Sequence, residues 1–217
     1  MNRKRWRAFG AARSCEQRKE CTMDGLRFFL EQYDFSRSVI EGMVLAGLSD
    51  MQIRRHPQEG QNSLAWLIWH VARWEDFAMT ILDQEQRQLF DRDDWMGRMR
   101  LSRRDGGTAM TYEESTALSA QIDLAELRAY WDAVGRRTRA VVMALDPQTL
   151  DDPVDAERLQ RHLAGGMLGS ERAQWVEQFF CNRTNGWLLS FVNLHLVEQM
   201  VGEALCVRSL GGVGLGL

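Results

Sequence analysis

Apolar residues recur at intervals of three and four along most of the chain from Met23 onward. This spacing is typical of amphipathic helices, and no alternation long enough for a useful β-strand occurs. The pattern predicts four long helices, over about 24–48, 62–85, 124–145 and 187–210. The polar segment over 90–110 is too long for a tight turn. We therefore predict an all-α protein, a four-helix bundle with at least one long crossover connection.

Residues that favour helix ends stand at several of these boundaries. Asn62 or Ser63 can cap the second long helix, and Asp123 can cap the third. Thr111, with Glu114 three residues later, has the spacing of a capping box and predicts a short helix before the third long one. Short helical pieces over 155–163 and 170–180, and polar loops over 54–60 and 90–110, are expected to join the long helices.

The composition is that of an ordinary globular protein. Of the 217 residues, 45% are hydrophobic and 26% are charged, which excludes a disordered chain. No run of eighteen uncharged apolar residues occurs, so we expect no membrane span and no membrane partner. We expect one domain over residues 23–212, followed by a flexible tail over 213–217.

The first 22 residues differ from the rest in charge. They contain both lysines and carry a local charge of +5, which leaves −8 on the remainder of a chain whose total is −3. No apolar stretch follows the basic residues, so a secretory signal is not expected and a cytoplasmic location is favoured. We interpret this segment as a disordered extension, or as sequence upstream of a start at Met23. A basic tail that binds nucleic acid is the less favoured interpretation.

Two of the four histidines fall on apolar helix faces. His70 lies between Trp66 and Trp74 at a spacing of four residues, and His195 lies in the middle of the fourth long helix. A buried imidazole requires a partner for each ring nitrogen, either a hydrogen bond or a metal ion. A single core histidine is usually a hydrogen-bonded structural residue, but two on facing helices of a bundle can form a metal site.

A third metal ligand would have to lie one helical turn from His195. Glu198 and Gln199 stand three and four residues after it, on the same face. The Glu198 carboxylate is chemically the better donor, because an amide oxygen is a poor ligand for Zn, Ni or Fe. The residues therefore predict either a divalent-metal site of His70, His195 and Glu198 or Gln199, or two structural histidines.

The remaining reactive residues are expected to have no special role. We expect His56 in an exposed loop, His162 on a surface helix, and Cys181 and Cys206 as small buried residues in a reducing environment. The charged residues that follow His70 within two helical turns could assist a reaction, but are better explained as a solvated rim. These residues are Arg73, Glu75 and Asp76.

Five segments together carry a resemblance to a known family. They are residues 62–76 (NSLAWLIWHVARWED), 94–95 (DW), 107–114 (GTAMTYEE), 127–138 (LRAYWDAVGRRT) and 202–211 (GEALCVRSLG). In their order and spacing they resemble the DinB superfamily, damage-inducible-type four-helix bundles that include bacterial thiol-dependent transferases. The resemblance spans about Met23 to Gly212.

The resemblance implies an up-down-down-up bundle with a divalent metal held by three histidines at one end of the core. One histidine comes from the second long helix and two come from an HxxxH pair on the fourth. His70 matches the first position and His195 matches one member of the pair. Gln199 then occupies the other.

The sequence departs from the family pattern at this pair. The second histidine of the pair usually lies two residues before a glycine, which, for Gly202, places the pair at Leu196 and Met200. Neither is a strong ligand. Either the helix carries a one-residue difference in register and His195 is a ligand, or the metal centre has degenerated.

The resemblance implies a metal-dependent enzyme of the thiol S-transferase or hydrolase type. It would act on a small molecule and use Zn, Ni, Fe or Mn, with a low-molecular-weight thiol as the possible second cofactor. Such a metal lowers the pKa of a bound water or thiol. The alternative is a metal-free bundle that acts as a dimeric stress-related or binding protein. A homodimer is implied by the family, and binding to nucleic acid is the least favoured function.

Overall fold

The computed structural model describes residues 24–83 and 87–213. The predicted extension over 1–22, the end of the second long helix near Glu85 and all but the first residue of the predicted tail lie outside the described residues. Within the described ranges every regular element is a helix, and the single β-bridge, between Pro153 and Thr184, is isolated. The prediction of an all-α protein is confirmed.

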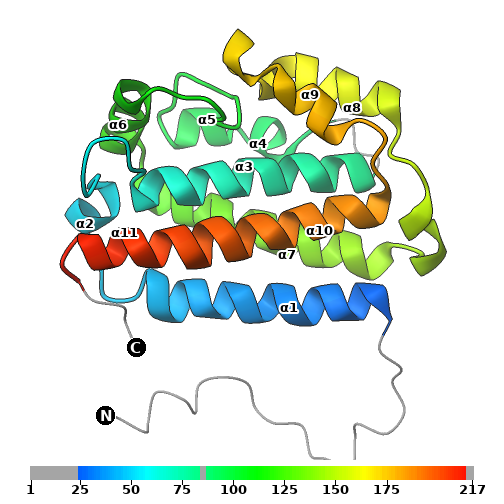
Figure 1. Cartoon of the computed structure of the whole chain (residues 1–217), viewed down its shortest axis with the longest axis horizontal. Helices are drawn as coiled ribbons and strands as arrows, with labels where there is room; N and C mark the ends of the chain where they lie inside the picture. The colour runs from blue at the N-terminus through cyan, green and yellow to red at the C-terminus, as the bar shows by residue number, and fades with distance from the viewer. Residues whose placement is uncertain (1–23, 84–86, 214–217) are drawn as a thin grey trace, which may run out of the picture.

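Four long helical segments lie side by side along the length of the molecule (Figure 1). They are α1 (Gly25–Val39), α3 (Leu64–Leu82), α7 (Leu124–Ala144) and a continuous stretch of α10 (Asn185–His195), η7 (Leu196–Glu203) and α11 (Ala204–Leu210). α3 packs against α7, α10 and η7, and all of its residues are buried. The segment that is apolar almost all round is therefore the centre of the core, as its pattern predicts.

The predicted helix caps are formed. The Ser63 hydroxyl accepts a hydrogen bond from the backbone N–H of Trp66 at 3.0 Å, and the Asp123 carboxylate caps α7. Thr111 and Glu114 make both hydrogen bonds of a capping box at the start of α6 (Tyr112–Gln121). These side chains satisfy backbone donors that have no partner inside the helix.

Several predicted boundaries are wrong. The first long helix leaves α-geometry at η3 (Ile40–Val44), a π-helical turn, and ends before residue 48. α2 (Asp50–Arg54) then forms between the predicted first helix and the predicted loop over 54–60, because Ser49 and Gln52 form a second capping box. The connection over 90–110 is not wholly loop, since α4 (Leu89–Arg92) and α5 (Trp95–Arg98) lie in its first part.

Short helices lie on the side of α3 that faces away from α1 (Figure 1). Apart from α4, α5 and α6 they are α8 (Ala156–His162), η5 (Leu163–Met167), η6 (Glu171–Ala173) and α9 (Trp175–Phe180). The helical pieces predicted over 155–163 and 170–180 are thus confirmed. η4 (Pro147–Asp151) instead packs against α10.

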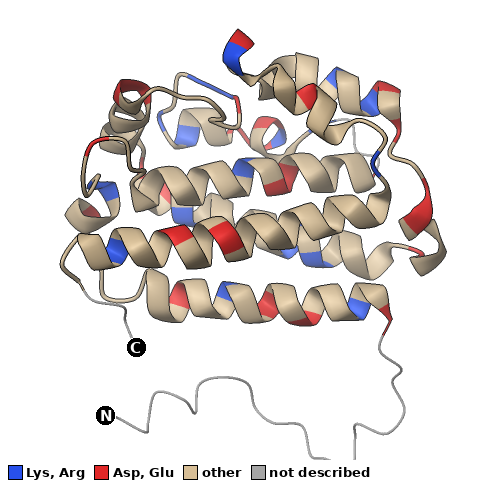
Figure 2. Ribbon diagram, viewed as in Figure 1, with Lys and Arg blue, Asp and Glu red and all other residues tan. Residues whose placement is uncertain are grey.

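The charged residues of α3 are buried, so the prediction of a solvated rim is wrong. Arg73, Glu75 and Asp76 are at most 2% exposed, and they are the only charged residues of this helix (Figure 2). They are covered because α7 and the crossover pack over the turns of α3 that carry them. Each of these charges therefore needs partners inside the protein.

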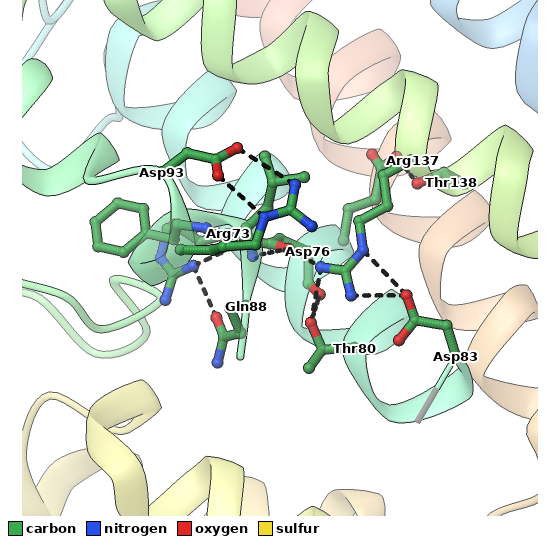
Figure 3. Close-up of polar contacts among 12 residues, drawn as sticks. Arg73, Asp76, Thr80, Asp83, Gln88, Asp93, Arg137 and Thr138 are labelled. Atoms are coloured by element: carbon green, nitrogen blue, oxygen red, sulfur yellow. Dashed lines mark hydrogen bonds and ion pairs between the residues drawn. The ribbon is translucent and has the colours of Figure 1, made fainter. Parts of the chain in front are cut away.

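Asp76 connects α3 to the crossover and to α7. Its carboxylate accepts hydrogen bonds from the backbone N–H groups of Leu89 at 3.0 Å and Phe90 at 2.8 Å. The Tyr130 hydroxyl donates at 3.0 Å and the Arg137 guanidinium at 2.7 Å, as Figure 3 shows for Arg137. Four donors thus stabilise a carboxylate that water does not reach, and they fix the start of the crossover on α3.

Glu75 belongs to a second buried polar group, which joins α3 to α1 and α7. It accepts hydrogen bonds from the hydroxyls of Tyr33 and Thr138, and one carboxylate oxygen lies 3.9 Å from the Arg37 guanidinium. Burial raises the pKa of Glu75 above 4.5, and Arg37 and the two hydroxyls oppose this shift. Both polar groups hold helices together and lie apart from the histidines.

The cysteines are also placed differently from the prediction. Cys181 and Cys206 are exposed rather than buried. Cys181 directly follows α9 and Cys206 lies on the outer side of α11, so neither fills the core. None of the helices in the described part of the chain is both long and apolar enough to cross a membrane.

Candidate metal centre

A cavity of about 530 Å³ lies between α3, the end of the crossover, α9 and the α10–η7 stretch. His70 of α3 and His195 of α10 both line it, as does Gln199 of η7. Aromatic side chains make up much of the remaining wall: Trp66, Trp74, Trp175, Phe179, Phe180 and Phe191. The volume falls within the range of about 300–1,000 Å³ that is typical of small-molecule sites.

His70 is held in one orientation and one tautomer. Its Nδ1 lies 2.5 Å from the carbonyl oxygen of Gly106, and because a carbonyl can only accept, Nδ1 must carry the proton and donate. The ring also stacks on Trp66 at a centroid distance of 4.4 Å. In the neutral ring the lone pair is therefore on Nε2. This is the arrangement of histidines that bind a metal through Nε2.

Two glycines allow the backbone of the crossover to place the Gly106 carbonyl beside His70. A Cβ at Gly106 would lie 2.7 Å from the Trp74 ring, and a Cβ at Gly107 would lie 2.5 Å from the Trp69 ring. Gly107 also has a φ of +78°, which strains residues with a side chain. The backbone can therefore pass over the two indoles and reach His70 only with glycine at both positions.

The two histidine rings lie close together. Their centroids are 5.7 Å apart and the ring planes are inclined by 32°. Two imidazoles that share one ion, with metal–nitrogen distances of about 2.1 Å, have centroids roughly 5–6 Å apart. Phe191 packs against His195 at a centroid distance of 4.1 Å and limits the movement of its ring.

Burial keeps both rings neutral at physiological pH. It lowers the pKa of His70 from 6.5 to about 4, against smaller raising effects of the Gly106 hydrogen bond and of Asp105. Burial, together with the neighbouring His70, lowers the pKa of His195 from 6.5 to about 3. A metal binds only neutral imidazole, so this environment suits ligation.

The structure separates the two candidates for a third ligand. Gln199 lines the cavity, and its Oε1 is buried with no hydrogen-bond partner. The Nδ1 of His195 is likewise buried and unpartnered. Glu198, the better donor chemically, is exposed and is absent from the cavity wall. The side chain that accompanies the two histidines is thus the amide.

The backbone of the fourth long helix explains why. Directly after His195 the helix widens into the π-helix η7, and a π-turn contains one residue more than an α-turn. Leu196 and Met200, where the family spacing would place the pair, are fully buried and do not line the cavity. Positions 195 and 199 thus lie at the cavity, whereas positions 196 and 200 lie in the core.

The donor set of this cavity is small and uncharged. Within the described residues, no three His, Cys, Asp or Glu side chains gather closely enough to hold a metal ion. The atoms on hand are two imidazole nitrogens and one amide oxygen. The unpartnered Nδ1 of His195 and Oε1 of Gln199, together with the Nε2 lone pair of His70, fit a divalent ion with two strong protein ligands and a weak third, which leaves further positions for small molecules.

The other two histidines lie outside the cavity but are less exposed than predicted. His56 is half-buried, because its ring nitrogens contact the Gln61 carbonyl at 2.7 Å and the Ser119 hydroxyl at 3.2 Å. His162 is 9% exposed, because α8 packs against α3. Neither belongs to the candidate site.

Sequence reasoning missed part of the site. It did not predict that Gly106 orients His70 or that α9 supplies a wall of the cavity. The glycine pair at 106–107 and the aromatic residues of Trp175–Phe180 were the available signals, but neither identifies the partner it packs against.

Comparisons with known proteins agree with the fold. Residues 32–198 match a family model described as the DinB superfamily. The structure is similar to a crystal structure described as a conserved protein from Enterococcus faecalis, with a TM-score of 0.66 and 20% sequence identity. The match covers 87% of this chain and 98% of that one. No curated protein matches.

Proposed function

Because the chain belongs to the DinB superfamily, we propose that it is a divalent-metal-dependent enzyme of the thiol S-transferase or hydrolase type. One observation carries the proposal. His70 and His195 have ring centroids 5.7 Å apart on the wall of one cavity, beside an unpartnered amide oxygen. Two neutral imidazoles with this spacing suit a shared metal ion better than a pair of hydrogen-bonded structural residues.

In this proposal His70, His195 and Gln199 hold the ion. A bound Zn, Ni, Fe or Mn would lower the pKa of a water or of a low-molecular-weight thiol and supply a nucleophile at neutral pH. The π-helix η7 favours a shift in helical register over the loss of the site, because it places His195 and Gln199 rather than Leu196 and Met200 at the cavity.

The residues of the chain have separate roles in such a site. The Gly106 carbonyl accepts from Nδ1 of His70 and so keeps the lone pair on Nε2. Trp66 stacks on His70 and Phe191 packs on His195, which fixes both rings. The aromatic walls keep bulk water away from a small-molecule substrate and strengthen the electrostatic interactions inside the cavity.

The proposal extends to the architecture and the setting. We assign the four long segments to an up-down-down-up bundle, since α1 and the α10–α11 stretch run toward one end in Figure 1 and α3 and α7 toward the other. The proposal also includes a cytoplasmic location, a homodimer and no binding to nucleic acid. The net charge of −8 outside residues 1–22 supports the last point, because phosphate backbones repel it.

The direct test is the metal content of the purified full chain and its response to the two histidines. We expect about one ion per chain in the wild type, a loss of binding in His70→Ala and in His195→Ala, and no change in His56→Ala. Titration with Co²⁺, followed by visible absorption, gives the affinities of the folded variants. A wild type without Zn, Ni, Fe or Mn above background that also fails to bind added Co²⁺ would contradict the proposal.

A further inference from the structure

The cavity around His70 and His195 has no fixed charge in its wall. Of the 20 described residues that line it, none is Lys, Arg, Asp or Glu. In a chain that is 26% charged, this is an unusual surface for a site that opens to solvent. In the metal-free protein, an ionised ligand group placed there would lose its hydration without gaining a counter-charge from the wall, which is costly.

Two arginines next to cavity-lining segments of the chain are already paired with carboxylates. Arg103 makes two hydrogen bonds to the Asp105 carboxylate, at 2.9 and 3.0 Å. Arg172, which precedes α9, pairs with Glu114 at 3.1 Å. These arginines stabilise the crossover and the start of α6, and their carboxylate partners already balance the charge that an anionic ligand would require.

The walls offer stacking surfaces instead. Trp74 stacks on Phe180 with a centroid distance of 5.7 Å, and Phe180 meets Phe191 edge to face at 5.1 Å. Trp66 and Trp175 line other parts of the cavity. Aromatic surfaces that are fixed by packing on one another favour flat, apolar ligands.

The polar atoms of the wall set the orientation of such a ligand. Five of its residues have a buried polar atom without a hydrogen-bond partner: Oε1 of Gln61, Nε1 of Trp74, Oγ of Ser115, Nδ1 of His195 and Oε1 of Gln199. The two amide oxygens can only accept hydrogen bonds. A ligand that satisfies them must therefore carry N–H or O–H donors.

We propose that this cavity binds an uncharged molecule with an aromatic ring and a hydrogen-bond donor, and discriminates against carboxylates of the same size. The inference deepens the proposed function by naming the substrate class of the same site. It predicts that the metal-free cavity binds neutral aromatic amides and alcohols in preference to aromatic acids.

Phenylacetamide and phenylacetate provide a matched pair of probes, because they differ only in an amide or a carboxylate on the same skeleton. Their affinities are measured by isothermal titration calorimetry at pH 7.5, with the full chain freed of metal by dialysis against EDTA. We expect phenylacetamide to bind at least about tenfold more tightly than phenylacetate. Equal or tighter binding of phenylacetate, or no binding of phenylacetamide up to about 10 mM, would overturn the inference.

Two lysine substitutions test whether the probes bind in this cavity. Thr108 lines the cavity, whereas Thr116 is exposed on α6 and does not. Thr108→Lys adds a cation to the wall and should lower the preference for phenylacetamide by at least about tenfold, and Thr116→Lys should leave it unchanged. If the two variants show the same preference, the probes bind elsewhere and the inference fails.

The outcomes keep the two proposals apart. Preferential binding of phenylacetamide by a protein that binds no Zn²⁺ or Co²⁺ supports the ligand class and contradicts the metal-dependent function. A protein that binds Co²⁺ through His70 and His195 but prefers phenylacetate in its metal-free form retains the proposed function and loses the ligand class.

Discussion

Both faces of α3 bury polar side chains, but these side chains make different numbers of hydrogen bonds on the two faces. On the face toward α7 and the crossover, the Asp76 carboxylate accepts four hydrogen bonds. On the face toward α10, His70 has one hydrogen bond, and the neighbouring His195 Nδ1 and Gln199 Oε1 have none. Only the second face adjoins a cavity. Burial alone therefore does not mark the candidate site, which is distinguished by unpartnered polar atoms beside a cavity.

Removal of Asp76 should have the largest effect on stability. Asp76→Ala leaves the Arg137 guanidinium without its buried partner and removes the acceptor for two crossover N–H groups. We expect a loss of about 3–5 kcal/mol in the free energy of unfolding, measured by urea denaturation. The control is Asp34→Ala, which breaks an exposed pair with Arg139 and should cost at most about 1 kcal/mol. Similar losses in the two variants would contradict a structural role for the Asp76 face.

Gly106→Ala should affect both stability and the histidine face. The new Cβ would lie 2.7 Å from the Trp74 ring, so the crossover must shift and its carbonyl must leave His70. We expect a loss of about 1–3 kcal/mol in stability and a reduction of about 10–100-fold in Co²⁺ affinity. Gly42→Ala, where nothing lies within 4 Å of the new Cβ, is the control. An unchanged Co²⁺ affinity in Gly106→Ala would show that the carbonyl does not position His70.

Gln199→His should strengthen metal binding, because it replaces the weak amide donor with an imidazole. We expect an increase in Co²⁺ affinity of at least about tenfold, or ~1.4 kcal/mol. Glu198→His introduces the same residue at the adjacent exposed position and should leave the affinity unchanged. A larger gain in Glu198→His would mean that the other side of the helix faces the metal.

Protonation of Glu75 should have the smallest effect, which is a dependence of the free energy of unfolding on pH. Its pKa in the folded protein is raised above 4.5, so the folded state holds a proton that the unfolded state releases. Its contribution is complete below pH 4.5 and is lost as pH rises through the folded pKa. Urea denaturation at several pH values should show this decline in the wild type and a smaller slope in Glu75→Gln. Identical slopes in the two proteins would contradict the pKa shift.

Much of the fold could be predicted from local pattern. Caps at Ser63, Thr111 and Asp123 depend on side chains three or fewer residues from the N–H groups they bind, so sequence spacing is sufficient evidence. The break after residue 44 and the short helices of the crossover were not predicted. Ser49 and Gln52 carried the capping-box signal for α2, but the apolar periodicity of the first long helix masked it.

The candidate site could be predicted only in part. The inward placement of His70 and His195 follows from their apolar neighbours one turn away, which belong to the same helix. Glu198 and Gln199 stand three and four residues after His195, so helical spacing alone does not choose between them. The choice depends on the π-helix that begins at Leu196. The buried state of Arg73 depends on residues 15 or more positions away along the chain, among them Gln88 and Arg104, which accept hydrogen bonds from its guanidinium.

The long helices, their caps, the apolar character of α3 and the two inward-facing histidines can be read from the sequence, because each follows from interactions within one or two helical turns. The tertiary structure sets what covers each face of α3. It placed four donors around one carboxylate and a single carbonyl beside His70, and it left the amide of Gln199 unpartnered at the cavity. The physical reason is that periodicity records which residues share a face. Whether a buried polar atom finds a partner depends on segments that are distant in the chain.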